Sequence, residues 1–234
     1  MEPTVRKSEV LRYLGYAGQE MTEDLDSRVD EIVLRCQADQ HPSGVFQVHP
    51  IAWTEDGRGR PAVSVEGTSL LFEGDDIVEY LQGATECALM ACTLGLKSER
   101  ELRRLSVIDA VDALIYGSAC TDLVEREADL VESRIVSAAH ERGLHTNYRY
   151  SPGYGDFDLA IQRPFIDALD AGRQLGVTVT DRNLLIPVKS ITAVVGLYPQ
   201  PPAQAKVGCA WCNCRDFCTV RAHGDTCYGR GDAR

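Results

Sequence analysis

The chain has 234 residues, of which 44% are hydrophobic and 25% are charged, a composition typical of a soluble globular protein. Its formal net charge of -11 argues against broad contact with nucleic-acid phosphates, because proteins that bind them usually carry a basic face. No run of residues approaches the length of about 18 apolar positions that a membrane span needs, and the N-terminal segment MEPTVRKSEV has no apolar signal core. We therefore expect a cytoplasmic protein that binds neither nucleic acid nor membrane.

The chain up to residue 95 predicts two helices, then strands and a third, short helix. Thr22 is a plausible N-cap of the second helix, in which Leu25, Val29 and Ile32 repeat on one face. Alternating apolar and polar residues on both sides of the turn EDGRGR predict a β-hairpin. In chain order the predicted elements are helices at 7–18 and 22–39, strands at 44–53, 61–67 and 68–74, a helix at 75–84 and a buried strand at 85–95.

The remainder up to residue 199 predicts long helices and a final pair of strands. Apolar residues recur at helical spacing from residue 97 to about residue 143. Residues 158–176 predict a further helix, kinked or started at Pro164, and residues 177–199 predict two strands around a loop at Pro187. With no internal repeats, this pattern predicts an α+β domain in which helices pack on a mostly antiparallel sheet.

Nine cysteines fall into two groups. Four are scattered among apolar neighbours, where a free cysteine behaves as a small buried hydrophobe. The other five follow a predicted linker at 199–207 and crowd a tail at 208–234. The scattered cysteines are Cys36, Cys87, Cys92 and Cys120, and those of the tail are Cys209, Cys212, Cys214, Cys218 and Cys227.

The cysteine-rich tail is a candidate metal site with Cys209, Cys212, Cys214 and Cys218 as ligands. Its spacing matches neither the paired Cys-x-x-Cys hooks of zinc sites nor the cysteine run of bacterial ferredoxins. An iron–sulfur cluster, a zinc ion, a mobile thiol tail and disulfides all remain open. An iron–sulfur centre would suit a relay of electrons.

The predicted loop YRYSPGYGDF, residues 148–157, contains one arginine and three tyrosines, more large side chains than a simple turn requires. A guanidinium can hold a carboxylate with two parallel hydrogen bonds, and aromatic rings can face a cation. Taken alone, the same composition also suits a surface turn fixed by a structural ion pair.

Several motifs occur in the order found in a known family. Arg149, Gly153 and Tyr154 match an Arg-x-x-x-Gly-Tyr signature, and VTVTD and PVKSITAVVG match a later pair of strands. These motifs resemble the activation domain of cobalamin-dependent methionine synthase. EVLRYLGYAGQE and CTLGLKSERELRRLSVIDAVDALIYGSACTDLVE are similar to its stand-alone bacterial form, in which the activation module is a separate polypeptide. The resemblance covers roughly residues 8–198.

The resemblance implies a domain at 1–198 with a twisted, mostly antiparallel sheet and a concave, activation-domain-like shape. In that family the domain binds S-adenosylmethionine beside a corrin, and cobalamin is supplied by a partner domain. The partner implied here is therefore the cobalamin-binding domain of methionine synthase, with a reductase, a flavodoxin or a ferredoxin as electron donor.

The resemblance also implies a set of S-adenosylmethionine-binding residues. Arg149 suits the ligand carboxylate, and Ser151 and Gly153 belong to the loop whose backbone would approach the ligand. Tyr154 could stack on the adenine or face the sulfonium. Asp122 matches an acidic residue of the long helix, where many relatives have glutamate.

The function implied is that of a stand-alone activation subunit, which supports the reductive remethylation of cob(II)alamin on a partner corrinoid domain. This makes the chain a methyltransferase component in methionine biosynthesis whose catalysis is completed with its partner, and no residue is assigned a catalytic role. Two alternatives remain. One is an iron–sulfur or thiol-dependent reductive activator of another corrinoid methyltransferase, and the other is a non-catalytic S-adenosylmethionine-binding module.

Overall fold

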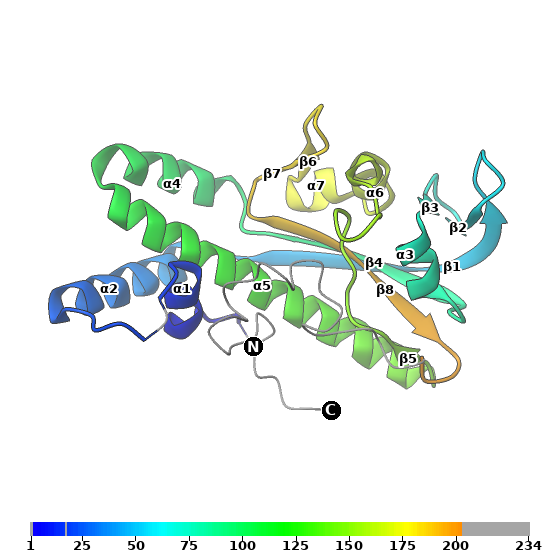
Figure 1. The fold of residues 1–234 in the computed structure, drawn as a ribbon, viewed down its shortest axis with the longest axis horizontal. Helices are drawn as coiled ribbons and strands as arrows, with labels where there is room; N and C mark the ends of the chain where they lie inside the picture. The colour runs from blue at the N-terminus through cyan, green and yellow to red at the C-terminus, as the bar shows by residue number, and fades with distance from the viewer. Residues whose placement is uncertain (1, 17, 203–234) are drawn as a thin grey trace.

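The computed structural model describes residues 2–16 and 18–202, and Figure 1 shows its ribbon. The elements in chain order are α1 (Lys7–Tyr13), α2 (Glu23–Asp39), β1 (Ser43–Glu55), β2 (Pro61–Val65), β3 (Leu71–Glu73), α3 (Asp75–Leu81), β4 (Glu86–Thr93), α4 (Leu96–Ile108), α5 (Ala110–Glu141), β5 (His145–Thr146), the 3-10 helix η1 (Leu159–Ile161), α6 (Gln162–Ala168), α7 (Ala171–Leu175), β6 (Thr178–Val179), β7 (Leu185–Ile186) and β8 (Ser190–Tyr198).

Six strands form one antiparallel sheet in the order β3-β2-β1-β4-β8-β5, and β6 and β7 form a separate hairpin. The first part of β1 pairs with β4 and its second part pairs with β2, so one long strand carries the hairpin away from the sheet centre. The predicted fold class, an antiparallel sheet with packed helices, is confirmed.

The strand β4 lies between β1 and β8, and both of its faces are buried. Ala88 and Met90 enter one core cluster, whereas Leu89 and Ala91 enter the other. A strand covered on both faces has no need of polar positions. This explains the continuous apolar run at residues 85–95, for which a buried strand is predicted.

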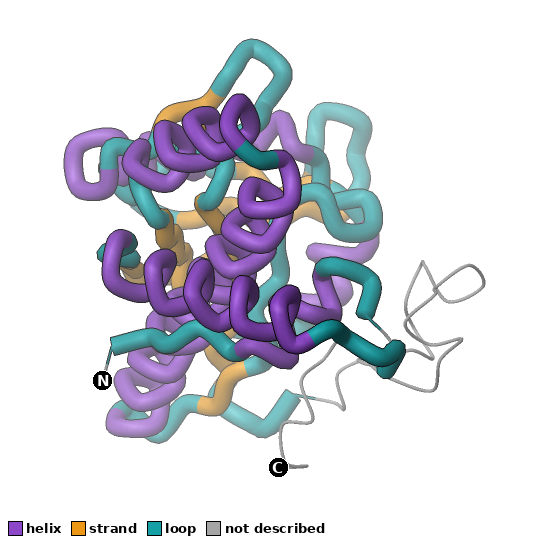
Figure 2. The backbone as a smooth tube through the Cα atoms, turned by 90° about the vertical axis from the view of Figure 1, so that its left-hand side faces the viewer, coloured by secondary structure: helices purple, strands orange, loops and turns teal. Residues whose placement is uncertain are grey.

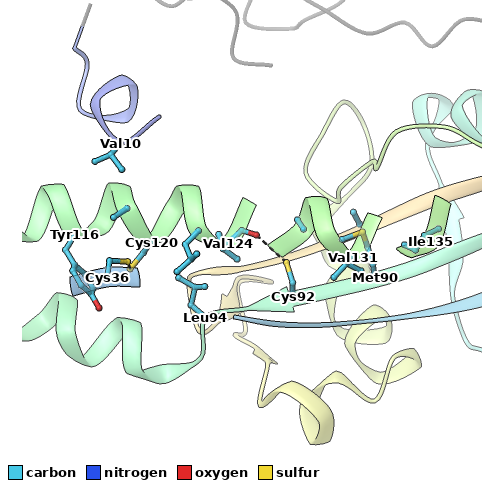
Figure 3. Close-up of a cluster of buried hydrophobic side chains, with 14 of the residues drawn as sticks. Val10, Cys36, Met90, Cys92, Leu94, Tyr116, Cys120, Val124, Val131 and Ile135 are labelled. Carbon is cyan, nitrogen blue, oxygen red and sulfur yellow. Dashed lines mark hydrogen bonds between the residues drawn. The ribbon is translucent and has the colours of Figure 1, made fainter. Parts of the chain in front are cut away.

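Each sheet face has its own layer of helices. The first core cluster joins α1, α2, α4 and α5 to one face, and Figure 3 shows Val10, Cys36 and Cys120 of this cluster beside the strand residues Met90 and Cys92. Figure 2 views the molecule from the end where α2 and α4 lie, with helices in front of the strands. The second cluster packs α3, α6 and α7 on the opposite face.

The helix α5 is the longest element and runs along the sheet in Figure 1. Asp109 begins it, because its side chain accepts hydrogen bonds from the backbone N–H groups of Val111 and Asp112. The single helical stretch predicted from residue 97 is therefore wrong in one respect, since Asp109 divides it into α4 and α5. Thr22 caps α2 as predicted, accepting from the Leu25 N–H at 3.3 Å.

The helix predicted at 158–176 is three short pieces, η1, α6 and α7. Pro164 lies in the first turn of α6, where the missing N–H costs no helical hydrogen bond. Asp170 has φ of 50°, a left-handed conformation that ends the run before α7. The two strands predicted at 177–199 become the β6–β7 hairpin and β8.

The predicted tail at 208–234, with the candidate ligands Cys209, Cys212, Cys214 and Cys218, lies outside the described residues. Between residues 2 and 202, apart from residue 17, no helix combines the length and apolar character needed to cross a membrane. The same residues contain no group of three or more His, Cys, Asp or Glu side chains placed to hold a metal ion.

Candidate functional site

The loop at 148–157 is fixed to the sheet at one end. Tyr150 and Val194 of β8 exchange backbone hydrogen bonds of 2.8 Å in both directions. Beyond this bridge the loop folds back on itself, because the Gly153 N–H donates to the Phe157 carbonyl at 2.7 Å and the Tyr154 N–H donates to the Ser151 carbonyl at 3.2 Å. The loop is therefore an ordered element and not a simple connection.

Most of the loop's aromatic rings belong to the second core. Tyr80 of α3 stacks on Tyr150 with ring centroids 5.2 Å apart and meets Tyr148 edge-on at 5.5 Å. Phe157 also stacks on Tyr150, with ring centroids 6.2 Å apart, and is buried. Burial raises the pKa of Tyr150 to about 12, so its hydroxyl stays protonated. Tyr154 differs from the others, since 62% of it is exposed.

Two aspartates tie the loop to the start of α3. Asp156 accepts hydrogen bonds from the backbone N–H groups of Asp75 and Asp76, at 2.6 and 3.0 Å. Asp76 in turn accepts from the Asp156 N–H at 3.1 Å. There is no room for a side chain at Gly155, because a Cβ there would lie 2.0 Å from Asp76 Oδ2.

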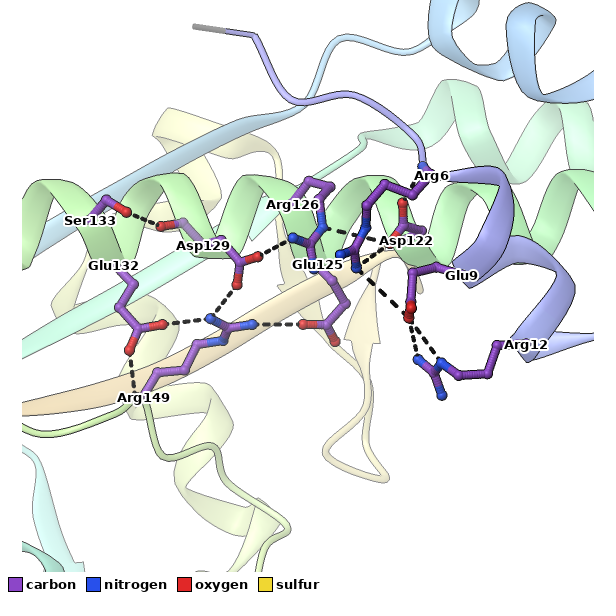
Figure 4. A network of polar contacts seen from close by, with 10 residues as sticks. All are labelled: Arg6, Glu9, Arg12, Asp122, Glu125, Arg126, Asp129, Glu132, Ser133 and Arg149. Carbon is purple, nitrogen blue, oxygen red and sulfur yellow. Dashed lines mark hydrogen bonds and ion pairs between the residues drawn. The ribbon is translucent and has the colours of Figure 1, made fainter. Parts of the chain in front are cut away.

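Arg149 points toward α5, where it meets three carboxylates (Figure 4). Its Nη1 donates to Asp129 at 2.7 Å and to Glu132 at 2.5 Å, and its Nη2 donates to Glu125 at 2.9 Å. Burial opposes the charge of Arg149, but Glu132 and Asp129 outweigh it and raise the pKa of the guanidinium. Arg149 is therefore held as a cation.

The three carboxylates lie on one face of α5 because of their spacing in the sequence. Glu125, Asp129 and Glu132 continue the row that begins at Asp122, at steps of three and four residues, so they share one face of α5. Reasoning from the sequence did not single them out. Their periodicity was visible, but nothing in the sequence showed that Arg149 would lie opposite them.

Asp122 is buried, with 1% of its surface exposed. It accepts a 2.7 Å hydrogen bond from the Arg6 backbone N–H, and its carboxylate forms ion pairs with Arg6 at 3.4 Å and with Arg126 at 3.6 Å. Arg126 also pairs with Asp129 at 2.7 Å. A chain of charges thus connects Asp122 to Arg149 through Arg126 and Asp129, as Figure 4 shows.

The predicted site residues lie in two places, the ionic network on α5 and the folded-back part of the loop. Arg149 and Asp122 belong to the same ionic network on α5, but the Asp122 carboxylate is enclosed by Arg6 and Arg126. Ser151, Gly153 and Tyr154 lie in the folded-back part of the loop, and Gly153 has φ of +95°, a conformation that favours glycine. A ligand contact by any of these five residues stays a prediction.

The fold is shared with a solved structure. The crystal structure of the MetH reactivation domain bound to AdoHcy superposes with a TM-score of 0.57, at 14% sequence identity, over 93% of this chain and 74% of that chain. No protein-family model matches the sequence, and no curated protein matches it. At this level of sequence identity the likeness shows the fold alone.

Proposed function

We propose that this chain binds S-adenosylmethionine on the face formed by the 148–157 loop and α5, and that it serves as the activation component of a cobalamin-dependent methionine synthase. The observation that carries the proposal is the shared fold with the MetH reactivation domain, whose crystal structure holds AdoHcy. An arginine held as a cation beside three carboxylates supports it, because the amino-acid end of S-adenosylmethionine carries one group of each charge.

Arg149 retains the capacity to bind a ligand carboxylate. Asp129, Glu132 and Glu125 take three of its N–H donors, whereas a guanidinium has five. The remaining donors can hold one carboxylate by charge-assisted hydrogen bonds. The α5 carboxylates can then accept the ligand ammonium, so that the zwitterion fits without stripping Arg149 of all its partners.

The loop supplies the other proposed contacts. Tyr154 is largely exposed, so its ring is available to an adenine or a sulfonium. Ser151 and Gly153 lie in the folded-back part of the same loop, and we propose that the backbone there approaches the ligand. Asp122 is proposed to contribute by holding Arg126 in the ionic network that faces Arg149.

In this proposal the chain binds and orients the methyl donor and the partner supplies the acceptor. Cobalamin on the partner domain would accept the methyl group after a one-electron reduction by a reductase, flavodoxin or ferredoxin. No side chain of this chain is assigned a part in bond making; its proposed role is to present the sulfonium. The irreversible methylation would pull an unfavourable reduction forward by mass action.

Calorimetric titration of the purified chain with S-adenosylmethionine tests the proposal, with and without a methionine synthase cobalamin domain in the cob(II) state. We expect binding that tightens when the corrinoid domain is present, because the site would then be completed across two chains. An affinity for S-adenosylmethionine that is the same with and without the corrinoid domain would refute the activation role and favour a binding module. Absence of binding in both titrations would refute the ligand assignment itself.

A further inference from the structure

The helices α4 and α5 meet at Asp109, at the left-hand end of the molecule in Figure 1. A groove of about 530 Å³ lies between them at this corner. Four of the six residues that line it are exposed, so the groove opens to solvent. The lining residues are Leu102, Arg103 and Ser106 of α4 and Ala110, Ala113 and Leu114 of α5.

Large apolar side chains at the same corner are exposed to solvent. They are Val107, Ile108, Val111 and Leu114, and Val107 is 87% exposed. By contrast, the buried residues of α4 are only Ser98 and Leu105. A surface helix normally turns its apolar residues toward the core. An apolar cluster that stays outside, beside a groove, therefore marks a surface for a protein partner.

The outer face of α4 combines apolar ends with a basic centre. Leu96, Arg100, Arg103 and Val107 follow one another at steps of four, three and four residues, so they share one face of the helix. All four are exposed. Arg103 also lines the groove, so this stripe and the groove adjoin. Together they are called the corner surface below.

The two arginines of the corner surface are not neutralised by carboxylates of the same helix. Within the part of the chain that the structure describes, the side chains of Arg100 and Arg103 form no ion pair and no hydrogen bond. The two glutamates of α4 are already engaged. Glu101 pairs with Arg104 at 2.7 Å, and Glu99 accepts a 2.6 Å hydrogen bond from a backbone N–H of the segment before β8. In a chain of net charge -11, this is a local excess of positive charge that an acidic partner can neutralise.

We propose that the corner surface docks an amphipathic helix of a protein partner. That helix places an apolar side chain in the groove and carboxylates against Arg100 and Arg103. A second copy of this chain fits less well, because an antiparallel pairing of two such stripes puts arginines opposite arginines. A membrane also fits less well, because a groove receives a protruding side chain and the chain as a whole is acidic.

The corner surface is separate from the network around Arg149. Leu114 lies 11 residues before Glu125 on α5, which is about 16 Å along the helix axis. The inference therefore does not depend on the proposed function.

Two synthetic helical peptides test the proposal on the full chain. Both have leucines at steps of three and four residues, and they differ only in their charged residues, which are glutamates in one and lysines in the other. The fluorescence anisotropy of each labelled peptide is measured as the chain is added. We expect saturable binding of the glutamate peptide that weakens with added salt, although the net charge of -11 favours the lysine peptide. No saturable binding of the glutamate peptide up to about 1 mM of the chain, or tighter binding of the lysine peptide, would overturn the proposal.

Arg103→Glu makes the test specific to the corner surface. The affinity for the glutamate peptide should fall by about tenfold or more, because an attraction becomes a repulsion. Arg182→Glu is the matched control, with the same change of charge at an exposed arginine between β6 and β7. It should keep the parent affinity. Equal affinity in Arg103→Glu and the parent, or equal losses in the two variants, would overturn the assignment.

Leu114→Gln tests the groove itself. Because this side chain is largely exposed, urea denaturation should give the same midpoint as for the parent. The affinity for the glutamate peptide should nevertheless fall by about fivefold, since the peptide loses an apolar contact. Unchanged affinity would show that the groove takes no part in docking.

Two further measurements separate the other occupants. Sedimentation velocity shows whether the chain forms a dimer, and flotation shows whether it binds vesicles of phosphatidylserine and phosphatidylcholine. A dimer that Arg103→Glu dissociates would overturn the proposal in favour of a second copy. Vesicle binding that Arg103→Glu abolishes would overturn it in favour of a membrane surface.

Discussion

Asp76 and Asp156 lie 80 positions apart in the sequence, and each accepts a hydrogen bond from the backbone N–H of the other. This reciprocal contact fastens the tip of the 148–157 loop to α3, while the Tyr150–Val194 bridge fastens its beginning to β8. The loop therefore has two separate anchors. Arg149 directly precedes the Tyr150–Val194 bridge, so its position opposite α5 depends on that bridge and on the ionic network. The position of Tyr154 depends on the Asp76–Asp156 contact.

Replacing Gly155 with alanine should loosen the Asp76–Asp156 contact. Gly155 has φ of +53°, and an added Cβ would meet both Asp76 Oδ2 at 2.0 Å and the Tyr150 hydroxyl at 2.8 Å. We expect Gly155→Ala to lower the free energy of unfolding by about 1–3 kcal/mol, since backbone strain and displaced contacts add. Urea denaturation measures the loss.

Gly143→Ala is the matched control for this substitution. Gly143 also has a positive φ, of +72°, but a Cβ there would meet nothing within 4 Å. It should therefore show only the cost of the left-handed conformation, about 1 kcal/mol. Equal losses in the two variants would mean that the Asp76–Asp156 contact does not constrain the loop.

Much of the fold was predictable because its signals are local. The Thr22 cap, the hairpin turn and the apolar run of β4 each depend on residues close together in the sequence. The break at Asp109 was missed because apolar spacing continues through it, although an aspartate followed by a helical run is a capping pattern. β5 was missed because two residues in a strand carry no periodicity.

Of the candidate site, the loop with Arg149 could be predicted from the sequence, but the carboxylates that hold Arg149 could not. The loop composition and the resemblance both drew attention to Arg149, but the carboxylates that hold it come from positions 17 to 24 residues earlier in the chain. Helical spacing puts these acids on one face, and only the packing of the loop against α5 decides what they meet. For the same reason the resemblance implies a ligand contact for Asp122, a prediction that is still untested, and the sequence does not reveal that Arg6 encloses its carboxylate.

Arg149→Ala should affect both ligand binding and stability. Removing the guanidinium takes away the proposed carboxylate contact, so the affinity for S-adenosylmethionine should fall by about 1.5–3 kcal/mol. It also leaves three carboxylates facing one another, which should destabilise the half-buried network by about 1–3 kcal/mol. Calorimetry and urea denaturation separate the two effects.

Arg142→Ala is the control for Arg149, because Arg142 also pairs with a carboxylate, that of Glu86, but lies at an exposed position. Its loss of stability should be smaller than that of Arg149→Ala, as for surface ion pairs, and its ligand affinity should equal that of the parent. If Arg149→Ala bound S-adenosylmethionine with unchanged affinity, Arg149 would be a structural tie alone.

Asp122→Asn tests the link between the N-terminal segment and α5. An amide can still accept from the Arg6 N–H, but it cannot neutralise Arg6 and Arg126, so we expect a loss of about 1–3 kcal/mol in stability. Amide exchange at Arg6 should become faster by hydrogen–deuterium exchange. Glu141→Gln, an exposed position on the same helix, should change neither quantity, and unaltered exchange at Arg6 in Asp122→Asn would contradict the tie.

Stability should fall as the pH rises above the ordinary cysteine pKa of 9.0. Burial raises the pKa of Cys87 and of Cys92 to about 12, so the folded state keeps protons that the unfolded state releases. The unfolded state then binds fewer protons, which makes the free energy of unfolding decrease with pH from about 9 to about 12. The contribution of each thiol is fully present below pH 9 and is lost progressively through that window.

Cys92 provides the measurement, because its thiol lies 3.7 Å from the Val124 carbonyl deep in the first core (Figure 3). In urea denaturation at about pH 8 and about pH 9.5, the parent should lose on the order of 1 kcal/mol per buried thiol between the two conditions. Cys92→Ala is less stable at both pH values because it leaves a cavity, but its loss between them should be smaller, since one titrating group is gone. An identical loss in parent and variant would show that the Cys92 thiol does not titrate differently in the folded and unfolded states.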